Sequence, residues 1–190
     1  MPTTNADTLT VPVLGFAAWS GTGKTTLLKQ LLPLLQNEGV RVGMIKHAHH
    51  DFDIDHPGKD SYELRKAGAR QMLIASARRW ALMVENEDRQ ADPVLGELLS
   101  HLDTDRLDLI LVEGFKHEAI PKIELHRRNV DKPWLYPDDP DILAVASDAP
   151  PPEDCALPQL DLNQPAVIAR FILENMLGRA APALDGVECE

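Results

Sequence analysis

The sequence predicts an α/β fold in which a mostly parallel sheet carries helices on both faces, with a small extra β segment. Residues 11–45 contain an apolar run, a leucine-rich stretch and a second apolar run. This is the pattern of a parallel βαβ unit with a right-handed crossover. Further apolar runs of strand length follow, of which residues 107–112 are the clearest core strand. The 190 residues suit one domain of this kind.

The first βαβ unit is expected as a strand at 11–17, a helix at 25–38 and a strand at 40–45. Six leucines in the helical stretch predict that it is buried on much of its surface. Gly39 can end it in the left-handed conformation. Pro33 lies inside the helix and should kink or shorten it, because proline removes one backbone hydrogen bond.

The remaining elements follow from apolar periodicity and turn residues. Helices are expected at 61–67, 93–102 and 165–177, and strands at 71–75, 80–84, 107–112, 122–127 and 142–146. Residues 122–127 alternate apolar and polar side chains, which predicts a half-exposed strand. The extra β segment is assigned to residues 70–90 and 118–130. We expect a flexible leader at 1–10, a single domain at 11–178 and a flexible tail at 179–190.

Composition excludes several classes of protein. No apolar run approaches the ~20 residues of a membrane helix, and the first residues lack the basic and apolar regions of a secretory signal. We therefore expect a cytoplasmic protein. The net charge of −11 argues against general nucleic-acid binding. Cys155 and Cys189 have no metal or redox spacing, so two reduced thiols are expected.

The strongest motif is AWSGTGKT at residues 18–25, between the first strand and the first helix. Backbone amides of such a loop and the following helix N-terminus hold the phosphates of a nucleotide. The expected binding residues are Ser20, Gly21, Thr22, Gly23, Lys24, Thr25 and Thr26. Lys24 should reach the terminal phosphates, and the Thr25 hydroxyl should bind Mg²⁺. Ala18 replaces the usual first glycine, which is tolerable if its φ stays negative. The motif indicates a P-loop NTPase.

A P-loop site also needs an acidic group for the metal and its water. Glu113 follows the strand at 107–112, so it should lie at the carboxyl edge of the sheet, where ligands of open α/β folds bind. We assign Glu113 to Mg²⁺ binding through water or to orienting the attacking water. Asp108 lies at the opposite end of the strand and is expected to be structural.

The polar segment at residues 46–60 holds four of the seven histidines together with several aspartates. It can be a transition-metal site, a plain solvated loop, or a switch or substrate loop beside the nucleotide, and we favour the last. Asp53 is the candidate for Mg²⁺ binding and catalysis, since that ion prefers carboxylates to imidazole. The candidates for contact with substrate or partner are Lys46, His47, His50, Asp55, Lys59 and Asp60, with Lys116 at the mouth of the site.

Two arginine pairs, 78–79 and 127–128, could clamp phosphates, but solvated arginines at strand ends are the favoured interpretation.

Together these motifs resemble the molybdopterin-guanine dinucleotide biosynthesis protein B (MobB) family. The matching segments are SGTGKTTLL, IKHAHHDFDIDHPGKDSYELRKAGA, DLILVEGFK and KIELHR, and the resemblance covers residues 13–148. It implies a homodimeric protein that binds GTP with Mg²⁺ and hydrolyses it weakly. Such a protein acts with the guanylyltransferase MobA, which attaches GMP to molybdopterin.

The resemblance does not locate the residue that reads guanine. Asp148 is our candidate, because a carboxylate after the strand at 142–146 can accept hydrogen bonds from N1–H and the exocyclic amine. Two other functions use the same motifs. One is a small-molecule kinase with Asp53 as its base, and the other is a metallochaperone GTPase that loads a metal through the histidines.

Overall fold

The structure is a computed structural model that describes residues 11–48, 52–86 and 92–180. The expected leader at 1–10 and most of the expected tail lie outside these residues. The chain groups into two compact units. The first unit comprises the residues up to His47 and those from Val94 onward, and the second comprises Ala48–Pro93. Among the described residues, no helix has the length and apolarity needed to cross a membrane.

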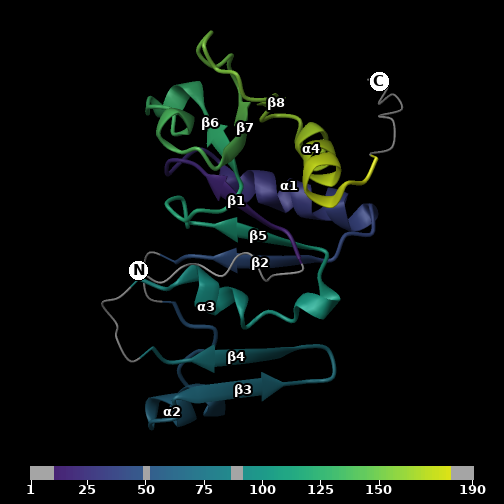
Figure 1. Cartoon of the computed structure of the whole chain (residues 1–190). Coiled ribbons are helices and arrows are strands. Elements are labelled where there is room, and N and C mark those ends of the chain that lie inside the picture. The colour runs from purple at the N-terminus through teal and green to yellow at the C-terminus, as the bar shows by residue number, and fades with distance from the viewer. Residues whose placement is uncertain (1–10, 49–51, 87–91, 181–190) are drawn as a thin grey trace, which may run out of the picture. The chain divides into compact units, whose positions relative to one another are not determined.

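The first unit contains a six-stranded sheet in which every neighbouring pair is parallel (Figure 1). Its order is β2-β5-β1-β6-β7-β8. The strands are β1 Val13–Ala17, β2 Val42–Lys46, β5 Leu109–Glu113, β6 Lys122–His126, β7 Ile142–Ser147 and β8 Gln159–Asp161. This confirms the predicted mostly parallel α/β fold. The three-residue β8 was not predicted, because a run so short carries no periodicity.

Helices cover both faces of this sheet, as predicted. On one face, α1 Lys24–Asn37 and α4 Pro165–Leu177 bury Leu31 and Ile172 against the strands. On the other face, the short α3 Leu95–Leu99 packs its apolar residues on β2 and β5. The core therefore lies in two apolar layers on either side of the strands.

Of the two effects expected of Pro33, a kink or a shorter helix, the structure excludes the second, since α1 continues past it to Asn37. Pro33 lies on the exposed side of α1, where water can bond to the carbonyl that loses its helical partner. Leu27, Leu28, Leu31 and Leu35 are buried on the opposite side. The chain then turns at Gly39 with a φ of 72°, as predicted for the end of this helix.

The second unit contains α2 Asp60–Lys66 and the antiparallel hairpin of β3 Gln71–Ala75 and β4 Trp80–Val84. Both strands fall at the predicted residues and form the extra β segment. The buried Arg65 guanidinium contacts the carboxylates of Asp53, Asp55 and Glu85 at 2.6, 2.7 and 2.6 Å. These hydrogen bonds raise the pKa of Arg65 and lower that of Asp55. An ionic cluster thus joins residues 53–55 to α2 and to the end of β4.

The prediction for residues 122–127 was wrong, because β6 is not half-exposed and does not belong to the extra β segment. It lies inside the main sheet between β1 and β7. Its polar side chains are buried against partners that only the fold supplies. The Lys122 ammonium donates to the Glu118 carbonyl at 2.6 Å and pairs with Asp139 at 3.1 Å. The alternation of polar and apolar residues therefore reflects buried polar pairs rather than a solvated face.

Glu124 is the most buried of these polar residues, with an exposed fraction of 0%. Its two carboxylate oxygens accept the backbone N–H groups of Leu135 and Tyr136, each at 2.8 Å. Burial raises the pKa of this carboxyl, and the two hydrogen bonds oppose that rise. Glu124 therefore fixes the connection between β6 and β7 from inside the sheet.

Replacing Glu124 tests this role. Glu124→Ala leaves two buried amides without an acceptor, so we expect the free energy of unfolding to fall by roughly 2–4 kcal/mol. Glu124→Gln keeps one side-chain acceptor and should cost clearly less. Urea denaturation monitored by circular dichroism measures both variants, and equal losses for the two would show that these hydrogen bonds are not what Glu124 contributes.

Candidate functional site

The loop between β1 and α1 has the backbone geometry of a phosphate-binding loop. Gly21 and Gly23 have φ values of 83° and 97°, a region that side chains disfavour. The buried Thr22 hydroxyl donates to the Trp19 carbonyl at 2.8 Å and closes the turn. The first helical hydrogen bond of α1 runs from Leu27 N–H to Gly23 O at 3.0 Å, so the amides of residues 23–26 have no acceptor within the helix. Free amides at a helix N-terminus are suited to contact an anion.

Ala18 fits this loop although it replaces a glycine. It is buried at the end of β1, and among the described residues other than glycine only Asp131 has a positive φ. The Lys24 ammonium folds back over the loop and donates to the carbonyls of Ala18 at 3.1 Å and Trp19 at 3.3 Å. These carbonyls hold the lysine at the loop, beside the amides that an anion would contact.

The predicted acidic residue lies at the same edge of the sheet. Glu113 ends β5 and pairs in register with Phe16 of β1 and Lys46 of β2, and its buried carboxylate forms an ion pair with the Lys46 ammonium. Burial lowers the pKa of Lys24; Glu113 raises it, while Lys46 and Lys116 lower it further. The structure therefore brings Lys24, Lys46, Glu113 and Lys116 into one electrostatically coupled group.

Asp108 lies at the opposite end of β5, as expected, and has a structural role. Its carboxylate accepts the Arg41 backbone N–H at 2.8 Å and the Arg41 guanidinium at 2.9 and 3.0 Å. The Arg41 hydrogen bonds hold the pKa of this carboxyl well below its usual range. The pair joins β5 to the start of β2 on the side away from the phosphate loop.

Trp19 connects the phosphate loop to two cationic residues. Its indole N–H donates to the Pro133 carbonyl at 2.8 Å. The Lys116 ammonium lies 4.5 Å from the ring centroid and that of Lys132 lies 5.8 Å from it, within the range of a cation–π contact. Lys116 is thus at the mouth of the loop, where we expected it.

The sequence favoured a solvated arginine at position 127, and this was wrong. Arg127 instead makes three hydrogen bonds within the site. Its Nε donates to the Thr22 carbonyl of the phosphate loop at 3.0 Å. Its Nη1 contacts Asp148 Oδ2 and Asn163 Oδ1, each at 3.3 Å. The arginine therefore joins the phosphate loop to the residues that follow β7 and β8. Only the strand order, which places β6 beside β1, could have revealed this.

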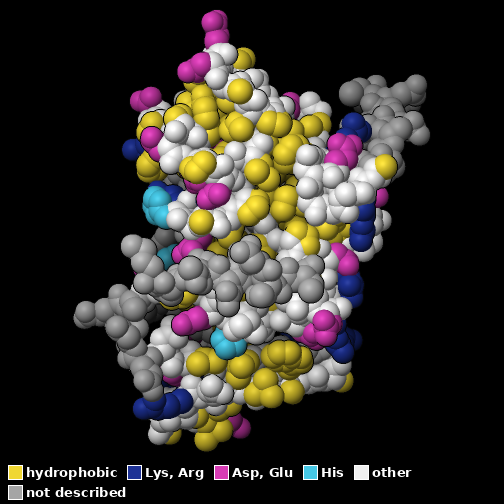
Figure 2. All heavy atoms as spheres, viewed as in Figure 1, with side chains coloured by type: hydrophobic (Ala, Val, Ile, Leu, Met, Phe, Trp, Pro, Cys, Tyr) yellow, Lys and Arg dark blue, Asp and Glu magenta, His cyan; other side chains and the backbone are white. Residues whose placement is uncertain are grey.

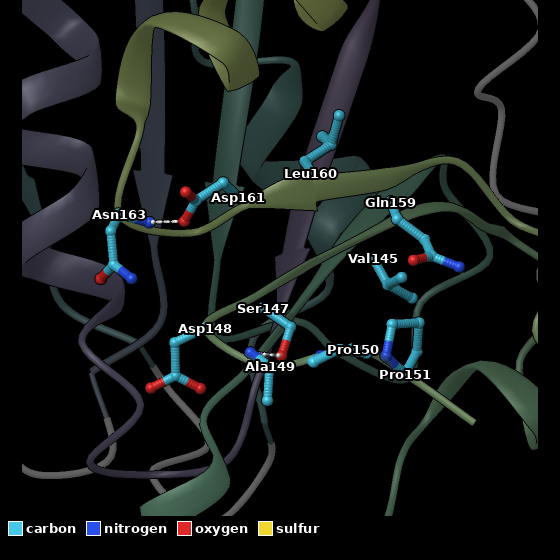
Figure 3. A pocket seen from close by; sticks show the side chains of 10 residues that line it. All are labelled: Val145, Ser147, Asp148, Ala149, Pro150, Pro151, Gln159, Leu160, Asp161 and Asn163. Atoms are coloured by element: carbon cyan, nitrogen blue, oxygen red, sulfur yellow. Dashed lines mark hydrogen bonds between the residues drawn. The ribbon is translucent and has the colours of Figure 1, made fainter. Parts of the chain in front are cut away.

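Asp148 lies beside a cavity of about 350 Å³ at the carboxyl ends of β7 and β8 (Figure 3). The carboxylate accepts the Arg128 backbone N–H at 3.0 Å. This hydrogen bond and the nearby Arg127 lower the pKa of Asp148, which keeps its carboxylate ionised at neutral pH. The other polar residues that line the cavity are Ser147, Gln159, Asp161 and Asn163.

The remaining candidate residues are divided between the two units. Asp53, Asp55, Lys59 and Asp60 belong to the second unit, where Asp53 and Asp55 contact Arg65. His47 belongs to the first unit and stacks on Phe115, with ring centroids 5.1 Å apart. His50 lies outside the described residues. Within the described ranges, no group of three His, Cys, Asp or Glu residues could hold a metal ion.

A parallel sheet whose first strand and first long helix are joined by such a loop defines a protein of the P-loop α/β class. The chain belongs to the MobB family. The model for this family, described as molybdopterin guanine dinucleotide synthesis protein B, matches residues 13–148. This confirms the resemblance seen in the motifs.

Curated relatives agree with this membership. The "molybdopterin-guanine dinucleotide biosynthesis adapter protein" of Escherichia coli is 56% identical over 87% of this chain and 94% of its own length. The protein of the same name from Haemophilus influenzae is 46% identical over 88% and 90%.

Solved structures are similar to this fold. The MobB homologue of Bacillus stearothermophilus has a TM-score of 0.65 at 24% identity, and the alignment covers 88% of this chain and 99% of that one. MobB of Bacillus subtilis has a TM-score of 0.66 at 20% identity, over 87% and 97%. At these identities the likeness establishes the fold.

Gly114 follows Glu113 directly and lies close to His47, and a substitution of Gly114 tests this close approach. Its φ is 95°, and a Cβ placed there would lie 2.7 Å from His47 Cβ and 3.2 Å from the His47 carbonyl oxygen. Gly114→Ala should therefore lower the free energy of unfolding by more than the roughly 1–2 kcal/mol of backbone strain alone.

Gly178→Ala is the matched control for this variant. Gly178 also has a positive φ, 59°, but a Cβ there would have no atom within 4 Å, so it reports the strain without the collision. Thermal denaturation compares the two variants, and equal losses of stability would contradict a close approach of Gly114 to His47.

Proposed function

We propose that this chain binds GTP with Mg²⁺ at the loop of residues 18–26 and acts as an adapter in molybdopterin-guanine dinucleotide formation. The observation that supports nucleotide binding is the loop itself, with its free helix amides and the Lys24 ammonium held over it. The adapter role rests on family membership and on the names of relatives up to 56% identical to this chain.

The residues of the loop fit a triphosphate. Gly21 has no atom within 4 Å of the position where a Cβ would lie, so the backbone is open to a ligand on that side. The exposed Ser20, Thr25 and Thr26 supply hydroxyls and amides at the helix N-terminus, whose positive end favours anions. Lys24 would release its two carbonyl contacts and pair with the terminal phosphates instead.

The donor set also fits Mg²⁺, which prefers hydroxyl and carboxylate oxygens. Thr25 would bind the ion directly, and Glu113 would bind it through water or orient the attacking water. When bound, the ion neutralises part of the charge on the phosphates. Asp53 remains our candidate for a further contact, for which it would have to leave Arg65. Glu113 is the one carboxylate that we assign to the attacking water, and we propose a slow hydrolysis rather than rapid turnover.

The partner of this adapter is proposed to be the guanylyltransferase MobA with its molybdopterin substrate. The exposed Lys46, Lys59 and Asp60, together with His47, His50 and Lys116, are the side chains we assign to that contact. Asp55 is buried and paired with Arg65. It would therefore act indirectly, by fixing through this ion pair the segment that carries it. A cytoplasmic location accords with this role and with the buried free thiol of Cys155.

A homodimer is the assembly we propose, with the hairpin of the second unit as its contact surface. The register Leu73↔Leu82 and Ala75↔Trp80 places these side chains on one face of the hairpin, and Trp80 is 65% exposed. Hydrophobic side chains gather over β3 and β4 in Figure 2. An isolated two-stranded sheet is marginally stable in water, so the same apolar face of a second copy is a suitable cover.

Substitution of Lys24 and Glu113 tests nucleotide binding. Lys24→Ala removes the charge that contacts phosphate, so GTP affinity should fall about 100-fold while the fold is kept. Glu113→Gln should retain GTP binding and slow its hydrolysis. Calorimetric titration with GTP, GDP and ATP, with and without Mg²⁺, measures the first effect, and phosphate release measures the second.

Lys29→Ala is the control for these variants, because Lys29 lies exposed on the same helix. It should bind and hydrolyse GTP as the unchanged protein does. Wild-type hydrolysis rates in both Lys24→Ala and Glu113→Gln would refute this location of the site.

The dimer contact is tested by Leu82→Lys. Burying an ammonium in an apolar contact is costly, so the dissociation constant of the dimer should rise at least ~10-fold, measured by sedimentation velocity over a range of concentrations. Val94→Lys changes an exposed aliphatic residue of the first unit and should leave the dimer intact. Dissociation by both variants, or by neither, would exclude the hairpin as the contact.

A further inference from the structure

We infer that Asp148 and Asn163 read the guanine base together, and that Arg127 is the positioning residue that holds both against the phosphate loop. This inference rests on the proposed binding of GTP at residues 18–26. The inference adds to that proposed site two residues that determine base specificity, and an arginine that links the phosphate end of the site to the base end.

The first support is the position of the cavity beside Asp148. Its volume of about 350 Å³ is within the range of ligand pockets. Ser147, Asp148 and Asn163 come from the carboxyl ends of neighbouring parallel strands, β7 and β8. This is the edge of the sheet that also carries the phosphate loop, since β6 pairs with both β1 and β7 in parallel. A nucleotide held by its phosphates at the loop can extend its base along that edge.

The second support is the set of contacts that Arg127 makes. One guanidinium reaches the Thr22 carbonyl in the loop, Asp148 after β7 and Asn163 after β8. Its Nε would lie 3.6 Å from a Cβ at Gly23, so the arginine packs directly against the loop. The planar fork of arginine suits several acceptors at fixed angles. The loop, Asp148 and Asn163 are therefore held in one fixed arrangement.

The third support is the chemistry that this arrangement leaves available. The Asp148 oxygens accept the Arg128 backbone N–H and the Arg127 Nη1, and an ionised carboxylate has about four acceptor positions. The carboxylate therefore keeps acceptor capacity for N1–H and the exocyclic amine of guanine. Because the Asn163 carbonyl oxygen faces Arg127, its amide N–H₂ can donate to guanine O6.

Hydrogen bonds to Asp161 also fix the backbone at Asn163, which supports a constant position of its side-chain amide. The Asp161 carboxylate accepts the Asn163 N–H at 2.8 Å and the Gln164 side-chain amide at 2.9 Å, which is a local turn. Adenine offers an acceptor where Asp148 needs a donor, and a donor where Asn163 also donates. The pair is therefore complementary to guanine and rejects adenine.

The test compares dissociation constants for GTP, ITP and ATP, each with Mg²⁺, by calorimetry. ITP lacks only the exocyclic amine, so the unchanged protein should bind GTP at least ~10-fold more tightly than ITP, the worth of one hydrogen bond to a charged group. Asp148→Asn should bring the ratio of the two constants close to one. Asn163→Ala should weaken GTP and ITP by the same factor, about 3–10-fold, and keep their ratio.

Arg127→Met tests the positioning role, because it leaves Asp148 and Asn163 unchanged in the sequence but removes the guanidinium that holds them. We expect it to lose the preference for GTP over ITP as Asp148→Asn does. Arg128→Met is the matched control, since it keeps the backbone N–H that bonds to Asp148, and it should retain the preference. If Arg127→Met does not fold, Arg127→Lys serves instead, because its ammonium keeps the charge but lacks the fork.

The outcomes separate this inference from the proposed function. Equal affinity of the unchanged protein for GTP and ITP, with tight binding of both, overturns the base-reading pair and leaves the phosphate site standing. A full GTP preference in Arg127→Met overturns the positioning role. Failure of every nucleotide to bind overturns the proposed function, and this inference with it.

Discussion

Parallel pairing of the six strands is the constraint on which the rest of the structure depends. Because every neighbouring pair runs in the same direction, the carboxyl ends of β1, β5, β6 and β7 share one edge of the sheet. The phosphate loop, Glu113, Arg127 and Asp148 come from these four strand ends, which span more than one hundred positions of the chain. Each of these four strands thus ends at one part of the candidate site, while its apolar residues are buried in the core.

The charge at this edge is opposite to that of the chain as a whole. The protein has a formal net charge of −11, yet Lys24, Lys46, Lys116 and Arg127 converge around the loop. Burial of Lys24, together with repulsion from Lys46 and Lys116, lowers the pKa of its ammonium, and a bound polyanion would relieve this repulsion. Glu113 pairs with Lys46 and Asp148 with Arg127, and these carboxylates offset part of the positive charge. The second unit relies on charge as well, through Arg65 and its three carboxylates, because its hairpin is too small for an apolar core.

The sequence alone was sufficient for the local elements and for the phosphate loop. The phosphate loop is a local motif, a glycine-rich turn between an apolar run and a leucine-rich helix. It can therefore be predicted from the order of residues along the chain. The same holds for β3 and β4, α4 and the position of Glu113 at the end of β5. The motifs at 45–69 and 108–116 also indicated the family that the comparisons confirm. Pro33 does not shorten its helix, because it lies on the side of α1 that faces water.

The tertiary structure decided what depends on strand order. Residues 122–127 read as a half-exposed strand, because nothing near them in the chain shows that Glu124 caps the amides of Leu135 and Tyr136. Arg127 likewise read as a solvated arginine, whereas its acceptors lie 105, 21 and 36 positions away. A local pattern records whether a side chain is polar, but the free energy of burying it depends on partners that only folding brings within hydrogen-bond distance.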